Sequence, residues 1–281
     1  MKSWNPSYYD NHSDLQFRTS LVMLAELKLY GNETIVDIGC GTGRIASYLA
    51  KMVPNGSVIG VDISEQMISY ARETYTDENL SFVHKDVLEI EYEMCFDVAV
   101  SFWTLSWISN QSRALQNMFR SLKEGGRFIL MYPMRHDIYD IVDRVIISPE
   151  WCEHFENGIQ HRPFFSENEY RTIVNSFSDT YSVTMKCIPY EYETYDAMID
   201  SMLSWLKASD EIHDENEKRE FIKTIANKYL TYRDEPPGKY VVYFSVLEVS
   251  GMKIENQGRL LCEHGNDDNI LPDNFLHRMH I

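Results

Sequence analysis

The chain has 281 residues, of which 44% are hydrophobic and 13% aromatic, enough for a packed core and too many for wholesale disorder. Its formal net charge of −17 argues against a nucleic-acid partner or an anionic membrane surface, because phosphate binding calls for a basic patch and none is visible. We expect one large domain over residues 1–250 and a polar tail over residues 251–281, with the oligomeric state left open.

The cysteines and the apolar runs indicate the cytoplasm. No pair of cysteines has CxxC spacing, so we expect reduced thiols, with no disulfide framework and no metal site. No apolar run approaches the length of a membrane span, and the first ten residues lack the core of a signal peptide. The five cysteines are Cys40, Cys95, Cys152, Cys187 and Cys262.

In chain order, the first predicted element is a helix over residues 14–29, capped by Ser13 or Asp14. From about residue 34 to 132, short apolar strands alternate with amphipathic helices, a pattern typical of a parallel sheet with helices on both faces. The last of these helices is expected to end at the Gly125–Gly126 break. The five strands are predicted at residues 33–39, 57–63, 80–86, 96–102 and 126–133.

The second half of the chain is predicted to be mainly helical. Helices are expected within 133–175 and 195–233, with a strand near 180–188 between them and a last strand at 239–249. The fold class is therefore α/β, with a doubly wound, mostly parallel, seven-stranded sheet of Rossmann-like type. Within it we expect a lid helix over residues 1–30 and a cofactor-binding core over residues 31–132. A substrate cap that includes strand six is expected over residues 133–235, and the last strand over residues 236–250.

The segment from Asp37 to Gly43 is the most informative, because an apolar strand ends in an acid and is followed by GxGxG and a helix. Asp62 ends the next strand, where it can accept hydrogen bonds from both hydroxyls of a ribose. Dinucleotide sites favour GxGxxG, and Asp37 would repel a pyrophosphate. The same acid suits the cationic amino-acid end of S-adenosylmethionine, and Asp86 after the third strand suits an adenine amino group.

These motifs resemble the class I methyltransferases, whose signature is this glycine loop and the acid after the second strand. The likeness covers roughly residues 14–250 and implies S-adenosylmethionine as the cofactor. The cofactor contacts that it predicts are the motif residues and their neighbours, namely Asp37, Gly39, Cys40, Gly41, Gly43, Asp62, Ile63, Met67, Asp86, Val87 and Phe102.

Other stretches resemble the trans-aconitate and juvenile hormone acid methyltransferases, which methylate small-molecule carboxylates. They are residues 4–16, 101–111, 155–170 and the region of Trp205. The likeness implies an N-terminal helix that closes over the cofactor and brings Gln16 near Trp107. An amide and an indole N–H are neutral donors that can orient a carboxylate. We therefore predict Gln16 and Trp107 as catalytic residues. The substrate-binding residues are predicted to be Gln16, Trp103, Trp107 and His136.

Alternatives remain open. Gln16 also fits a solvent-facing helix start, and Trp103 and Trp107 also fit a core stripe. Members of this group often carry a histidine where this chain has Ser106. An amine or phenol acceptor with a histidine or tyrosine base is a rival function, and a non-catalytic cofactor-binding protein is another. The sequence does not separate a fatty or terpenoid acid from a small polycarboxylate.

Overall fold

One seven-stranded sheet organises the chain in the computed structural model, which describes residues 5–155, 164–176, 178 and 180–253. The strands are β1 Thr34–Ile38, β2 Ser57–Asp62, β3 Leu80–His84, β4 Phe96–Phe102, β5 Leu122–Pro133, β6 Thr180–Tyr192 and β7 Tyr240–Met252. Their order is β3-β2-β1-β4-β5-β7-β6. β1 to β5 are parallel, and β7 lies antiparallel between β5 and β6. The predicted doubly wound, mostly parallel sheet is confirmed.

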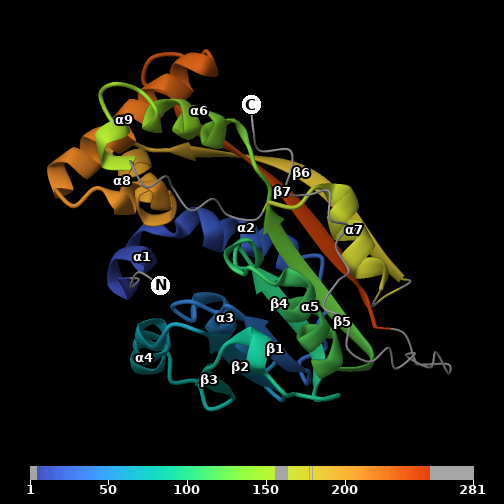
Figure 1. The fold of residues 1–281 in the computed structure, drawn as a ribbon. Coiled ribbons are helices and arrows are strands. Elements are labelled where there is room, and N and C mark those ends of the chain that lie inside the picture. Colours follow the sequence, from blue (N-terminus) through green and yellow to red (C-terminus); the bar gives the residue numbers. More distant parts are fainter. Residues whose placement is uncertain (1–4, 156–163, 177, 179, 254–281) are drawn as a thin grey trace.

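Helices flank the sheet and gather above the carboxyl ends of its strands. The α-helices are α1 Pro6–His12, α2 Asp14–Leu24, α3 Arg44–Met52, α4 Glu65–Thr74, α5 Gln111–Ser121, α6 Asp137–Ile146, α7 Glu167–Asn175, α8 Tyr195–Trp205 and α9 Glu215–Tyr232. Short 3-10 helices are η1 Val87–Glu89, η2 Leu105–Trp107, η3 Cys152–Phe155 and η4 Lys207–Glu211. α6, α8 and α9 form a cap, and α1 lies between this cap and the α3–α4 side of the sheet (Figure 1).

The buried strands send alternate side chains to opposite faces of the sheet, as a strand must. In β5, Ile129 and Met131 join the core shared with α2, α3 and the cap. Phe128, Leu130 and Tyr132 join the core shared with α5 and α7. Both faces of the sheet are therefore covered, and the carboxyl ends of β1, β2 and β4 meet beneath the cap.

The N-terminus holds two helices where the sequence pattern predicts one over residues 14–29. α1 is the additional helix: Pro6 occupies its first turn, and the Asn5 side chain accepts a hydrogen bond from the Tyr8 amide at 3.0 Å. Ser13 holds the cap position of α2 as predicted, although its side chain makes no capping hydrogen bond. α2 ends at Leu24, earlier than expected.

The Gly125–Gly126 pair does not end a helix, so that expectation is wrong. α5 stops at Ser121, and β5 begins at the next residue. Gly125 has a φ of 72°, and the pairing register of β4 with β5 shifts between Phe96 and Val98. The glycines therefore accommodate an irregularity inside a strand.

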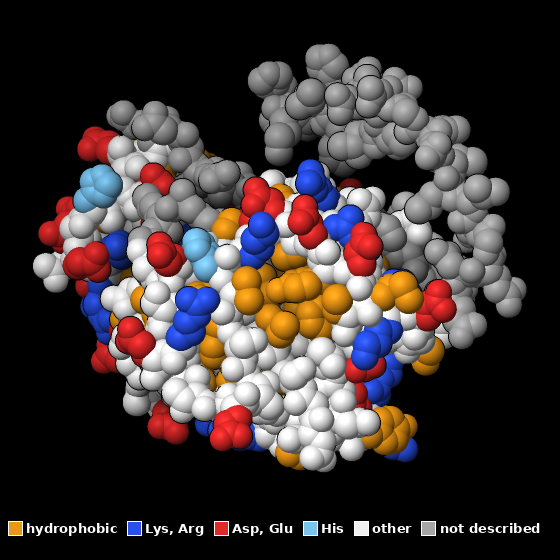
Figure 2. Space-filling model, turned by 90° about the horizontal axis from the view of Figure 1, so that it is seen from below, with side chains coloured by type: hydrophobic (Ala, Val, Ile, Leu, Met, Phe, Trp, Pro, Cys, Tyr) orange, Lys and Arg blue, Asp and Glu red, His pale blue; other side chains and the backbone are white. Residues whose placement is uncertain are grey.

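The last strand runs two residues into the segment expected as a tail, because Gly251 pairs with Phe128 and Met252 pairs with Arg127. Residues 254–281 of that tail lie outside the described part of the chain, as do residues 156–163 of the 155–170 stretch. Within the described ranges no helix is both long and apolar enough to cross a membrane. On the face shown in Figure 2, basic side chains are interspersed with acidic ones and form no continuous stripe.

Candidate functional site

The loop between β1 and α3 exposes bare backbone to a pocket. Its three glycines all have left-handed backbone conformations, with φ values of 74°, 53° and 85° at Gly39, Gly41 and Gly43. A side chain at Gly39 would collide with Thr104, whose nearest atom lies 2.1 Å from the ideal Cβ position. At Gly41 the nearest atom is 4.0 Å away, on the Tyr9 ring. Gly39 is therefore needed for packing, and Gly41 leaves room for a ligand.

Asp37 is the penultimate residue of β1 and carries a buried carboxylate, one oxygen of which has no hydrogen-bond partner among the described residues. Its side chain is 2% exposed, and its Oδ2 atom has no hydrogen bond among the described residues. Burial and the nearby charge of Asp62 raise the pKa of Asp37 to about 7. A buried acid without a donor is costly unless a ligand supplies one. The ammonium group of S-adenosylmethionine has the charge and the donors that Asp37 lacks.

Asp62 ends β2 and holds the glycine loop in place. One carboxylate oxygen accepts the Gly41 amide at 2.9 Å, and the other accepts the Ser64 amide at 2.8 Å. Burial raises the pKa of Asp62, although these hydrogen bonds act against that rise. Because a carboxylate has about four acceptor positions, Asp62 keeps acceptor capacity for a ribose hydroxyl.

The other predicted cofactor residues follow β2 and β3 or lie in α4. Ile63 is 45% exposed beside Asp62, where a flat apolar ligand could cover it. Asp86 accepts the Leu88 amide at 2.8 Å and so begins η1, in which Val87 is buried. Met67 is buried in α4.

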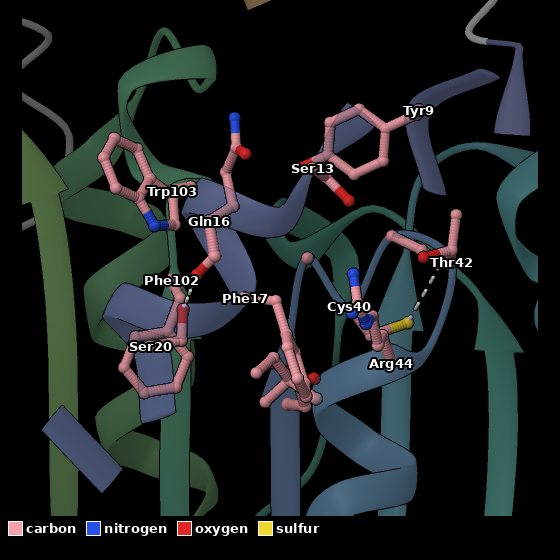
Figure 3. Close-up of a pocket in the computed structure, with 14 residues that line it drawn as sticks. Tyr9, Ser13, Gln16, Phe17, Ser20, Cys40, Thr42, Arg44, Phe102 and Trp103 are labelled. Carbon is pink, nitrogen blue, oxygen red and sulfur yellow. Dashed lines mark hydrogen bonds between the residues drawn. The ribbon is translucent and has the colours of Figure 1, made fainter. Parts of the chain in front are cut away.

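The pocket above the loop has an empty volume of about 460 Å³ that includes its open mouth. Its walls come from α1, α2, the glycine loop and the end of β4 (Figure 3). The lining residues are Tyr9, Ser13, Gln16, Phe17, Ser20, Asp37, Gly39, Cys40, Gly41, Thr42, Arg44, Ile45, Phe102 and Trp103. The pocket thus joins five of the predicted cofactor residues to two of the predicted substrate residues.

Polar contacts hold α1 against the cofactor loop. The Asp10 carboxylate accepts the Thr42 hydroxyl at 2.7 Å and the Tyr70 hydroxyl at 3.2 Å. On the opposite side, the Tyr8 hydroxyl donates to the Asp200 carbonyl of α8 at 3.1 Å. None of the residues of α1 is buried. α1 therefore bridges the cofactor side and the cap without a hydrophobic anchor of its own.

Gln16 is 8% exposed, and its Oε1 atom has no hydrogen-bond partner in the described structure. Its side chain projects away from the glycine loop (Figure 3). Trp103 lies beside it on the pocket wall and donates from Nε1 to the Thr19 hydroxyl at 3.2 Å. These two side chains are the predicted substrate residues that the pocket brings together.

Trp107 and His136 lie apart from the pocket lining. Trp107 ends η2, and its role stays a prediction. His136 is 8% exposed and packs at ring-centroid distances of 5.0 Å from Tyr139 and 5.3 Å from Phe244. Arg44, Phe17 and Asp10 also contribute to this face but were not predicted from the sequence. The Asn5–Pro6 start signal of α1 could have drawn attention to this face.

Comparison with known proteins gives consistent results. The methyltransferase domain family matches residues 29–178. The protein 235L of Invertebrate iridescent virus 6, which carries a methyltransferase name, is 28% identical over 231 residues, covering 82% of this chain and 86% of the relative. A juvenile hormone acid O-methyltransferase of Bombyx mori is 30% identical over 213 residues, covering 69% and 76%. A trans-aconitate 2-methyltransferase of Deinococcus radiodurans is 30% identical over 135 residues, covering 48% and 51%.

Solved structures share the fold. A phosphoethanolamine N-methyltransferase 2 of Haemonchus contortus, in complex with S-adenosyl-L-methionine, superimposes with a TM-score of 0.58 at 14% identity. The match covers 89% of this chain and 57% of that one. The predicted cofactor, enzyme class and resemblance are thereby confirmed.

Proposed function

The chain belongs to the methyltransferase domain family and uses S-adenosylmethionine, and from that premise we propose that it methylates the carboxylate of a small molecule to form a methyl ester. The observation that carries this proposal is Gln16, a neutral amide buried in the pocket wall with a polar atom that lacks a protein partner. The oxygen and nitrogen of such an amide are assigned by their surroundings. With the amide nitrogen facing the pocket, Gln16 can donate a hydrogen bond to an acceptor carboxylate.

The charges around the pocket suit a reaction that needs no base. Arg44 is the one cation among the described lining residues, and Asp14 holds it at 2.8 Å while its guanidinium stacks on Phe17 at 4.0 Å. No described histidine lines the pocket, and His12 lies with Nδ1 2.7 Å from the Tyr8 carbonyl oxygen. A carboxylate acceptor is ionised at neutral pH, so it can react without losing a proton to the protein.

The chain contributes orientation and the exclusion of water. S-adenosylmethionine, when bound, supplies an electrophilic methyl group on a sulfonium. Asp37 would hold its amino group and Asp62 its ribose, while the Gln16 amide would orient the acceptor carboxylate. Anion and cation lose charge together during the transfer, so a neutral donor binds the acceptor without stabilising the ground state more than the transition state. α1 covers the pocket and limits access of water.

The test is incubation of the protein with methyl-labelled S-adenosylmethionine and a metabolite extract, followed by mass spectrometry. The proposal predicts a labelled product that releases its label in mild alkali, as an ester does. Asp62→Ala serves as the control with impaired cofactor binding. A labelled product that survives mild alkali would instead support an amine or phenol acceptor, and cofactor binding without any labelled product would support a non-catalytic role.

A further inference from the structure

The turn that follows β4 has a strained backbone. Trp103 has a φ of 61°, in the left-handed region that a bulky side chain rarely occupies. Strain of this kind persists where the surrounding contacts impose it, and it is concentrated at functional sites. The contacts of Trp103 and of the next residue, Thr104, show what imposes it here.

Thr104 ties this turn to the cofactor loop. Its hydroxyl lies 3.1 Å from both the Gly39 carbonyl and the Phe102 carbonyl, which share its single proton. Its side chain also fills the space where a Cβ atom at Gly39 would sit. Because Gly39 has no side chain, the Thr104 side chain packs directly against the backbone of the glycine loop.

Trp103 ties the same turn to the helix that carries Gln16. Its indole N–H donates to the Thr19 hydroxyl at 3.2 Å. That hydroxyl lies 2.8 Å from the Leu15 carbonyl and 3.1 Å from the Gln16 carbonyl, and both carbonyls share its single proton. The indole ring packs edge-on against Phe244 at 5.8 Å, which fixes the ring from the other side.

We propose that Trp103 is a positioning residue that sets Gln16 at a fixed distance from the cofactor loop. The inference rests on the proposed function, in which Gln16 holds the acceptor. Two consecutive residues of one turn contact the two halves of the reaction site. Thr104 contacts the cofactor loop, and Trp103 contacts the helix that carries Gln16. An indole has a single N–H donor, and Thr19 uses it, so Trp103 acts through Gln16 and not by donating to the acceptor. In-line transfer is sensitive to displacements of about 1 Å, which can cost about a hundredfold in rate.

The kinetic test compares four variants after the acceptor has been identified. Trp103→Phe removes the donor, and Thr19→Val removes the hydroxyl with little change of shape. Each should lower kcat about tenfold to a hundredfold, with KM and cofactor affinity within about threefold of the parent. Thr19→Ser should restore most of the rate, and the double variant Trp103→Phe/Thr19→Val should be no slower than the slower single variant. Trp151 is a buried tryptophan between α6 and η3 that contacts Phe221 of α9, and Trp151→Phe is the matched control that should behave as the parent.

A second measurement needs no acceptor and separates this inference from the proposed function. In nuclear magnetic resonance spectra of the ¹⁵N-labelled protein, Thr19→Val should shift the Trp103 indole signal and the Gln16 side-chain amide signals, while Thr19→Ser leaves them near their parent positions. An unshifted Gln16 signal in Thr19→Val, or additive losses of rate in the double variant, would overturn the positioning role. Those results would leave ester formation untouched. An alkali-stable product would overturn ester formation, but the spectra would still decide the role of Trp103.

Discussion

Replacing Asp37 with asparagine measures what the buried carboxylate costs the folded protein. Burial and Asp62 raise the pKa of Asp37 to about 7, whereas an aspartate in an unfolded chain titrates near pH ~3.9. Between these two values the folded protein keeps a proton that the unfolded chain releases. Stability therefore falls as pH rises, by about 1.4 kcal/mol per pH unit, and levels off above about pH 7. The full cost is about 4 kcal/mol, of which about 3 kcal/mol is lost between pH 5 and pH 8.

The assay is urea unfolding without cofactor at several values between pH 5 and pH 8. Asp37→Asn stays neutral throughout, so the stability of the variant relative to the parent should grow with pH by about 3 kcal/mol. Asp97→Asn is the matched control. Burial acts to raise the pKa of Asp97, but hydrogen bonds from Lys123 and Thr34 outweigh burial and lower it. Its titration therefore lies below this window, and its difference from the parent should stay constant.

If the free energy of unfolding depends on pH equally in the parent and in Asp37→Asn, the reasoning is refuted. Such a result would mean that ionisation of Asp37 does not destabilise the folded protein. Cofactor binding offers an independent check. A cationic ammonium favours ionised Asp37, so the affinity of the parent for S-adenosylmethionine should rise with pH up to about pH 7. Asp37→Asn should bind more weakly and lose this part of the pH dependence.

Three further predictions concern the cofactor, the acceptor and α1. Asp62→Ala should weaken S-adenosylmethionine binding by about tenfold to a hundredfold, measured by calorimetry, because hydrogen bonds to a charged acceptor are lost; binding as tight as the parent's would contradict the ribose assignment. Gln16→Ala should lower turnover while cofactor affinity stays near that of the parent, and the parent's single-turnover rate at saturating cofactor should be nearly flat between about pH 6 and 9; a rate that climbs about tenfold per pH unit would point to a general base. Asp10→Ala should speed hydrogen exchange of the α1 amides and leave that of the α3 amides unchanged, because α1 is held by polar contacts; unchanged exchange in α1 would show that Asp10 does not hold it.

The cofactor half of the site could be predicted from the sequence because its geometry is local. The strand that contains Asp37, the glycine loop and the second strand, which ends in Asp62, all lie within residues 34–62. The left-handed backbone conformations of that loop favour glycine over residues that carry a side chain. The parallel sheet follows from the same alternation of short apolar strands and amphipathic helices.

The acceptor half could be predicted only in part. The sequence pointed to both Trp103 and Trp107, but their spacing of four residues suggested a helix, whereas the backbone turns left-handed at Trp103 and places that ring in the pocket wall. Hydrophobic periodicity gives no sign of a strained turn. The start signal of α1 at Asn5 and Pro6 was present, but the contacts of Asp10 join residues 32 and 60 positions apart. Side-chain hydrogen bonds over such separations leave no mark in a single sequence.

The topology of the sheet limits how the enzyme can open. β6 and β7 pair along 13 positions, and β7 pairs with β5 along seven, so the strands that carry α8 and α9 belong to the same sheet as the cofactor site. Separating β6 and β7 from the rest of the sheet would break that ladder of backbone hydrogen bonds, and buried strands are among the most costly parts of a protein to disrupt. Among the described elements over the pocket, α1 can be displaced at the cost of a few side-chain contacts. Access for both reactants is therefore expected to follow the movement of one short helix and not the separation of two domains.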